Sequence, residues 1–160
     1  MMTFWDFLRS RDRTAEELDR LQEKLDQQWT VCIGMGGHSD SGGIGGGTGG
    51  PRDGPLVSFA DTMDLLLRAR SRQIRQDKRL TEFLKTMEAR PGHRRRDALI
   101  LRDRYLKKMT WPDIVADLEK EGYHAVLRTV YLWHSDALRR GDQLWEELYS
   151  DERLHKGAGV

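Results

Sequence analysis

Apolar side chains recur every three or four residues along most of this chain, and that period predicts amphipathic α-helices. The first such stretch is residues 3–30, where Glu, Asp, Arg and Gln occupy the positions between the apolar ones. Its apolar stripe consists of Leu18, Leu21, Leu25 and Trp29. A helix of this kind must bury its stripe, either against another helix of the same chain or in a short coiled coil between copies.

A capping-box pattern inside this stretch indicates a helix boundary. Thr14 is followed three residues later by Glu17, so a second helix is expected to begin near Ala15. Residues 1–33 are therefore expected to form one or two amphipathic helices.

Residues 34–55 interrupt the helical pattern. They contain 11 Gly in 22 positions, a composition that predicts a flexible linker able to let the first helix fold back on the next. Gly45, Gly47 and Gly50 match the spacing G-x-G-x-x-G. No strand pattern precedes them, so we do not interpret them as a phosphate-binding loop.

Residues 56–92 are predicted to form one long charged helix. Ser58 or Asp61 can begin it, and it ends at Arg90-Pro91-Gly92 because proline cannot continue a helix. Its middle, RARSRQIRQDKR, is strongly basic. That face is either simply solvated or in contact with a phosphate backbone.

Residues 93–149 carry the sharpest helix signals. Asp97 can cap a first helix, and Thr110 can cap a second, with Pro112 in its first turn and Asp113 near the positive end of its dipole. Gly122 is expected to end that second helix. The interior of this region should include Ile114, Val115 and Leu118.

A third helix is predicted from Ala125 to Arg140, ending at Gly141. Its expected buried stripe is Val126, Val130, Trp133, Ala137 and Leu138. A last short helix over 144–149 and a flexible tail over 150–160 complete the chain. The predicted fold class is all-α, an N-terminal helical hairpin joined by a glycine-rich loop and followed by a helix-turn-helix.

Charge is unevenly spread, although the formal net charge is only +1. Residues 56–140 carry 19 Lys and Arg against 12 Asp and Glu, whereas residues 1–33 carry five against seven. A basic middle region fits a polyanionic partner. The single cysteine, Cys32, permits no disulfide within one chain, and no apolar run is long enough to span a membrane, so a soluble cytoplasmic protein is expected.

The sequence offers no catalytic or cofactor-binding motif, so we expect neither enzymatic activity nor a cofactor. The five histidines and Cys32 lack metal-ligand spacing. His134, Ser135 and Asp136 are adjacent, and neighbours on a helix point apart, so they cannot form a catalytic triad.

Residues 93–149 resemble a known protein family. The pattern Asp113-Ile114-Val115-x-x-Leu118, then Gly122-Tyr123, Thr129-Val130 and Ala137-Leu138, is similar to the fourth region of bacterial primary-type sigma factors. The whole layout resembles short phage and prophage proteins, including late-gene transcriptional regulators of the ArpU/RinA kind. The chain has about five extra residues around Gly122, which lengthen either the second helix or the turn.

This resemblance implies a DNA-binding transcriptional regulator whose partners are double-stranded DNA and the host RNA polymerase. The third helix would then enter the major groove and read bases there. The residues implied for base edges are Arg128, Thr129, Tyr131, Leu132 and Ser135. Those implied for phosphates are Lys107, Lys108, Arg139, Arg94, Arg95 and Arg96. The alternative is a non-enzymatic interaction protein whose helical C-terminal end binds another protein, and either kind could form a homodimer.

Overall fold

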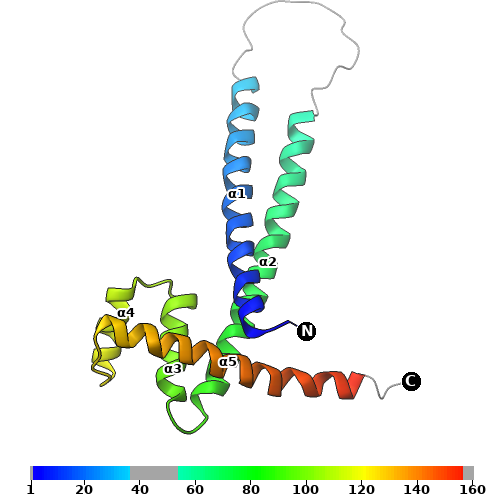
Figure 1. The fold of residues 1–160 in the computed structure, drawn as a ribbon. Helices are drawn as coiled ribbons and strands as arrows, with labels where there is room; N and C mark the ends of the chain where they lie inside the picture. The colour runs from blue at the N-terminus through cyan, green and yellow to red at the C-terminus, as the bar shows by residue number, and fades with distance from the viewer. Residues whose placement is uncertain (1, 37–53, 157–160) are drawn as a thin grey trace, which may run out of the picture. The chain divides into compact units, whose positions relative to one another are not determined.

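The computed structural model describes residues 2–36 and 54–156, and these are all-helical, with no strand among them (Figure 1). The elements are α1 (Phe4–Gly36), α2 (Gly54–Glu88), α3 (Arg94–Leu101), the π-helical turn η1 (Arg102–Leu106), α4 (Trp111–Lys120) and α5 (Leu127–Lys156). The predicted all-α class is confirmed. Residues 37–53, most of the predicted linker, lie outside the described residues.

The chain divides into two compact units, and one of them spans residues 12–74. In this unit, which we call the helix pair, α1 runs antiparallel to α2. Trp29 lies 5.6 Å from Phe59 between ring centroids, and Arg72 donates to Glu17 at 2.9 Å, so the end of α1 is level with the start of α2. The buried core is Leu18, Leu25, Leu66 and Ala69, with Leu21 packed against it, so three of the four predicted stripe residues pack against a helix of the same chain, whereas Trp29 is 54% exposed.

The ends of α1 and α2 differ from the sequence prediction. Helix α1 is continuous from Phe4, so Thr14 is a buried mid-helix residue and caps nothing. Helix α2 begins at Gly54 rather than at Ser58 or Asp61. Pro55 stands in its first turn, where the missing N–H would have had no helical partner. The helices therefore extend into both edges of the segment that was predicted as linker.

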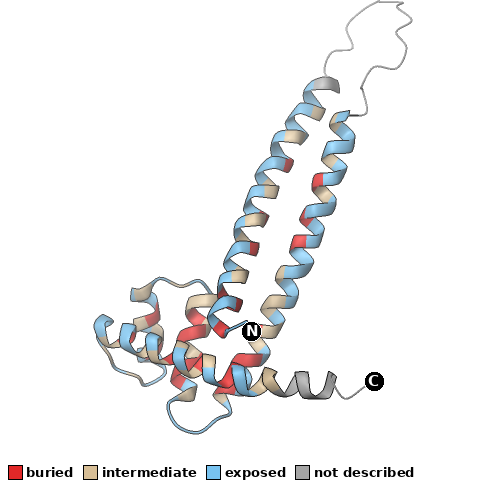
Figure 2. Cartoon of the chain, turned by 45° about the vertical axis from the view of Figure 1, so that its right-hand side comes forward, coloured by how far each residue is buried: buried red, intermediate tan, exposed pale blue. Residues whose placement is uncertain are grey.

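The other unit comprises residues 1–11 and 75–160, and an aromatic cluster forms its main core. The ring of Phe4 lies 4.6 Å from that of Phe83 and 5.5 Å from that of Trp145. Its aliphatic neighbours are Leu8, Leu80, Leu84, Met87, Leu101 and Leu144. Burial is concentrated in this cluster, whereas α1 and α2 are mostly exposed along the helix pair (Figure 2).

The prediction that a helix ends at Gly141 is wrong. Helix α5 continues through Gly141 to Lys156, so the separate short helix over 144–149 is absent and the tail predicted from residue 150 is helical to that point. A Cβ at Gly141 would lie 2.8 Å from the Phe4 ring. The glycine is therefore a packing residue rather than a helix terminator, because only a residue without a side chain lets the ring approach.

A second core cluster in this unit joins α3, α4 and α5. Its buried members are Ile100, Ile114, Leu118 and Val130, as the sequence predicted for the last three. Val126, also predicted to be buried, is 69% exposed because it precedes the first residue of α5.

Candidate nucleic-acid interface

Helix α4 begins where the sequence predicted. Thr110 is the N-cap, in extended conformation, and Pro112 lies in the first turn. The Thr110 hydroxyl donates to the Asp113 carboxylate at 2.7 Å and makes no side-chain bond to a backbone N–H. The two side chains thus lock each other across the first turn, and Asp113 keeps its negative charge near the positive end of the helix dipole.

The turn between α4 and α5 spans residues 121–126 and includes Gly122. Helix α4 stops at Lys120, and Gly122 has a φ of +89°, which favours glycine. The Tyr123 N–H donates to the Leu118 carbonyl at 2.9 Å, and the Gly122 N–H donates to the Glu119 carbonyl at 3.0 Å. These two bonds form a Schellman motif that ends α4, so the residues around Gly122 belong to the turn and not to the helix.

Aromatic rings hold α5 against α4 and η1. Trp111 meets Tyr131 and His134 edge-on, each at 4.9 Å between centroids. The Tyr105 hydroxyl and His134 Nε2 are 3.0 Å apart. Burial and then the nearby Arg104 guanidinium lower the pKa of His134 to about 4, so its ring is neutral near pH 7. His134 is thus a packing residue, and the sequence pattern did not link it to Trp111.

The first turns of α5 expose the side chains predicted to read bases, with one exception. Arg128 and Ser135 are exposed, Tyr131 and Leu132 are 43% and 61% exposed, and Thr129 is half-buried. Two further apolar residues that the prediction did not include, Val126 and Leu127, are also exposed here. The outer surface at the start of α5 is therefore less polar than predicted. We call the side chains of Val126, Leu127, Arg128, Tyr131, Leu132 and Ser135 the α5 surface.

Arg96, predicted to contact phosphate, is buried instead. Only 7% of this residue is exposed, and its guanidinium lies 4.1 Å from the centre of the Trp133 ring. This cation–π contact stabilises the packing of α3 on α5 and removes Arg96 from any surface. Its burial and its contact with Trp133 argue against the predicted phosphate contact.

Asp97 does not cap α3, contrary to the sequence prediction. The N-cap is His93, and the fully buried Asp97 carboxylate accepts a 2.7 Å bond from Arg140. A carboxylate this deeply buried needs a charged partner. The ion pair therefore ties the start of α3 to the middle of α5.

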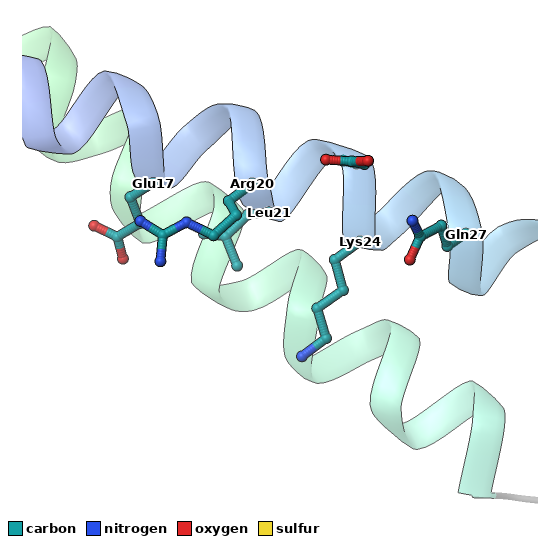
Figure 3. Close-up of a pocket in the computed structure, with 6 residues that line it drawn as sticks. Glu17, Arg20, Leu21, Lys24 and Gln27 are labelled. Atoms are coloured by element: carbon teal, nitrogen blue, oxygen red, sulfur yellow. The ribbon is translucent and has the colours of Figure 1, made fainter.

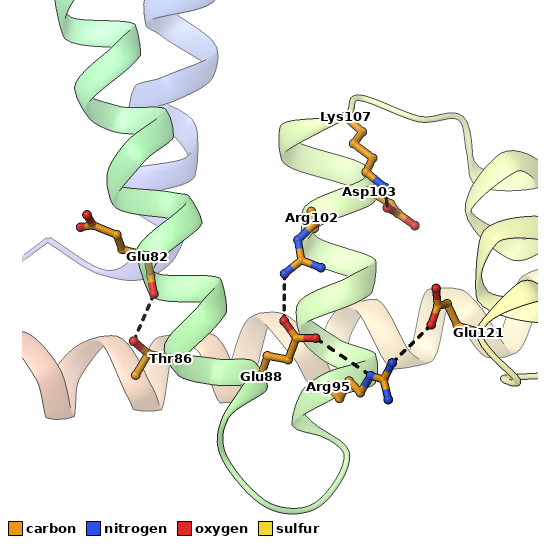
Figure 4. Close-up of polar contacts among 8 residues, drawn as sticks. All are labelled: Glu82, Thr86, Glu88, Arg95, Arg102, Asp103, Lys107 and Glu121. Atoms are coloured by element: carbon orange, nitrogen blue, oxygen red, sulfur yellow. Dashed lines mark hydrogen bonds and ion pairs between the residues drawn. The ribbon is translucent and has the colours of Figure 1, made fainter.

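Arg94 and Arg95 are largely engaged within the protein. Arg94 is half-buried and donates to the Arg140 carbonyl at 3.4 Å. Arg95 lies between two carboxylates, 4.0 Å from Glu88 and 3.4 Å from Glu121, and Glu88 also accepts from Arg102 (Figure 4). Protein carboxylates therefore partly neutralise the basic start of α3.

Lys107 and Lys108 follow the π-helical turn, and both are exposed. Lys107 lies 3.3 Å from the buried Asp103 carboxylate (Figure 4), and Lys108 has a φ of +52°. Burial, and then the neighbouring Asp117 carboxylate, raise the pKa of Asp103 to about 6. Arg139 is exposed as well, 3.3 Å from Asp136.

We also searched the described part of the chain for metal sites, pockets and membrane-spanning helices. Residues 2–36 and 54–156 hold no group of three or more His, Cys, Asp or Glu side chains arranged to bind a metal ion. One open hollow lies along α1, lined by charged and polar side chains and Leu21 (Figure 3). None of the described helices combines the length and apolar character that crossing a membrane requires.

The structure thus defines an all-helical protein in which a short capped helix, a Schellman turn and an exposed helix start follow one another. Comparison with known protein families, with curated proteins and with solved structures found no match to this chain.

Proposed function

We propose that this protein is a DNA-binding transcriptional regulator of phage or prophage type that reads DNA with α5. The observation that carries the proposal is the exposed α5 surface on a helix that is rigidly held. Ring contacts to Trp111 and the Schellman turn fix the start of α5, and the arginine at its front, Arg128, is exposed. Rigid support of an exposed helix is what major-groove recognition requires.

In this proposal Arg128 donates two hydrogen bonds to a guanine edge, while Tyr131 and Leu132 contact thymine methyl groups or sugars. Two exposed cations of the same unit, Lys108 and Arg139, contact phosphates and set the register. Lys107 adds a phosphate contact that competes with its bond to Asp103. The host RNA polymerase would be the second partner of such a regulator.

The proposal is tested by selecting bound duplexes from random DNA and measuring their affinity by fluorescence anisotropy. Replacing Arg128 by Ala should weaken binding to the selected site by about 1–3 kcal/mol, roughly 5- to 150-fold, and relax one base pair of the preference. The matched control is Lys85→Ala, an exposed cation on α2 far along the chain from α5. Equal losses in the two variants, or no selected sequence, would contradict the proposal.

A second candidate function rests on the apolar part of the α5 surface. Val126 and Leu132 are 69% and 61% exposed, and Leu127 is also exposed, which suits contact with another protein. Replacing Val126 and Leu132 by Ser together separates the candidates. A protein-binding surface loses its partner, whereas a DNA-reading surface keeps most of its salt-dependent affinity for duplex DNA.

A further inference from the structure

The helix pair carries a second apolar stripe outside its core. On α2 it consists of Leu56, Ala60, Met63, Leu67 and Ile74, and Arg70 takes the remaining position. The steps of four, three, four, three and four residues form a heptad pattern, typical of helices that pack against other helices. Leu56, Leu67 and Ile74 are 59%, 58% and 67% exposed, so these side chains are left uncovered in the described chain, whereas Met63, at the edge of the stripe nearest the core, is half-buried.

Helix α1 adds to the same face. Trp29 and Ile33 are more than half exposed, and Trp29 reaches Phe59 of α2. An α-helix turns about 100° per residue. Around the axis of α1, Trp29 and Ile33 therefore point about 40–80° away from the direction of the core residue Leu25. Around the axis of α2, the apolar stripe residues point about 60–120° away from the direction of the core residue Leu66. Because the two helices are antiparallel, rotations of the same sign place both sets on one side of the pair.

The opposite face is charged. The Glu17–Arg72 ion pair lies there, and so does the hollow lined by Arg20 and Lys24 (Figure 3). Leu65 and Val31 are exposed apolar residues on that side, and exposed Val57 points away from α1. The larger set of exposed apolar residues lies on the other face, which we call the stripe face.

We propose that the stripe face packs against the stripe face of a second copy of this chain, with the two helix pairs parallel. Charge selects this arrangement. Residues 12–33 of α1 carry six acidic and three basic side chains, whereas residues 54–74 of α2 carry two acidic and three basic side chains. If the two-fold axis runs parallel to the helices, the acidic α1 of one copy packs against α2 of the second copy. If the axis is perpendicular to the helices, α1 of one copy packs against the equally acidic α1 of the second.

Specific charges support the parallel arrangement. Because Glu17 pairs with Arg72, Asp19 is level with Arg70. Both are exposed and border the stripe face. In the parallel dimer Asp19 therefore meets Arg70 of the second copy, and the four helices form a bundle with the stripe buried. This inference is independent of DNA binding.

The first test is sedimentation velocity of the full chain across a concentration series without DNA. We expect a dimer whose dissociation constant rises tenfold or more for Leu67→Glu and for Ile74→Glu, with unchanged helicity by circular dichroism, since both side chains are exposed within the monomer. Leu65→Glu on the charged face is the matched control and should dimerise as the parent does. A monomeric parent at 100 μM (roughly the upper range for a specific weak dimer), or equal effects of Leu65→Glu and Leu67→Glu, overturns the proposal.

The second test addresses orientation. Asp19→Arg and Arg70→Asp should each weaken the homodimer, and an equimolar mixture of the two variants should recover it as a heterodimer, because each interface then regains opposite charges. A stronger dimer for Asp19→Arg would mean that α1 faces α1, and it would overturn the parallel arrangement.

Discussion

Two titratable side chains, the buried Asp103 and the half-buried His134, lie in the same unit and respond to pH in opposite directions. The pKa of Asp103 is raised to about 6, so its charge destabilises the fold as the pH rises from about 4 to about 6. The pKa of His134 is lowered to about 4, so stability is lost as the pH falls from 6.5 towards 4, where the unfolded chain takes up the proton first. Over this window the two contributions partly cancel.

Replacing Asp103 by Asn should remove the contribution of the Asp103 carboxyl to the pH dependence of stability. We expect the variant to be more stable than the parent at pH 7 and to lose stability more steeply between pH 6.5 and pH 4, where only His134 then acts. Urea unfolding at a series of pH values measures this difference. Parallel stability curves for the parent and the variant would show that the Asp103 carboxyl does not titrate in this range.

Among the elements, the turn after α4 places a strict requirement on the backbone. Gly122 has a positive φ, and its N–H and that of Tyr123 satisfy the last carbonyls of α4. The same turn sets where α5 begins, and therefore which side chains form the α5 surface. The backbone conformation at Gly122 thus determines which side chains form the α5 surface.

Gly122→Ala should destabilise the protein by about 1–2 kcal/mol, because an L-residue is strained at this φ even though no atom lies near its Cβ. The matched control is Gly34→Ala, which sits in α1 with equally open space and should be neutral or slightly stabilising. Chemical unfolding followed by circular dichroism compares the two. Equal changes in stability would contradict a specific role for the turn.

Taken as a whole, the molecule has fewer free cations at the proposed interface than its basic middle region suggests. Arg96 is buried, Arg95 faces two glutamates and Arg94 bonds to a backbone carbonyl. The exposed cations that remain for DNA are Arg128 and Lys108, together with Lys107 and Arg139, each of which also lies 3.3 Å from an aspartate carboxylate. Electrostatic attraction to DNA should therefore be modest.

The salt dependence of DNA affinity checks this expectation. With about four phosphate or guanine contacts from cations, the log–log slope against salt concentration should be about −3 to −4. Lys108→Ala should reduce its magnitude by about one. A slope of −7 or steeper would mean that the arginines at the start of α3 leave their intramolecular partners on binding.

The sequence alone determined the helices, the start of α4 at Thr110 and the burial of Ile114, Leu118 and Val130. These features depend on periodicity and capping within a few residues, which are local properties of the chain. The continuity of α1 and α5 was harder to predict from the sequence. Where tertiary packing favours continuing the helix, a glycine or a capping box does not mark a helix end. Phe4 against Gly141 is such a case.

Only the tertiary structure decided which charges are free and which aromatic rings support the α5 surface. Arg96 and Arg128 are both arginines on basic, helical stretches, yet one packs on Trp133 and the other faces solvent. The difference arises because Trp133, 37 positions further along the chain, is brought beside Arg96 when α5 packs on α3. Local pattern cannot encode such a contact, because it depends on how separate helices meet and on the desolvation of the charges between them.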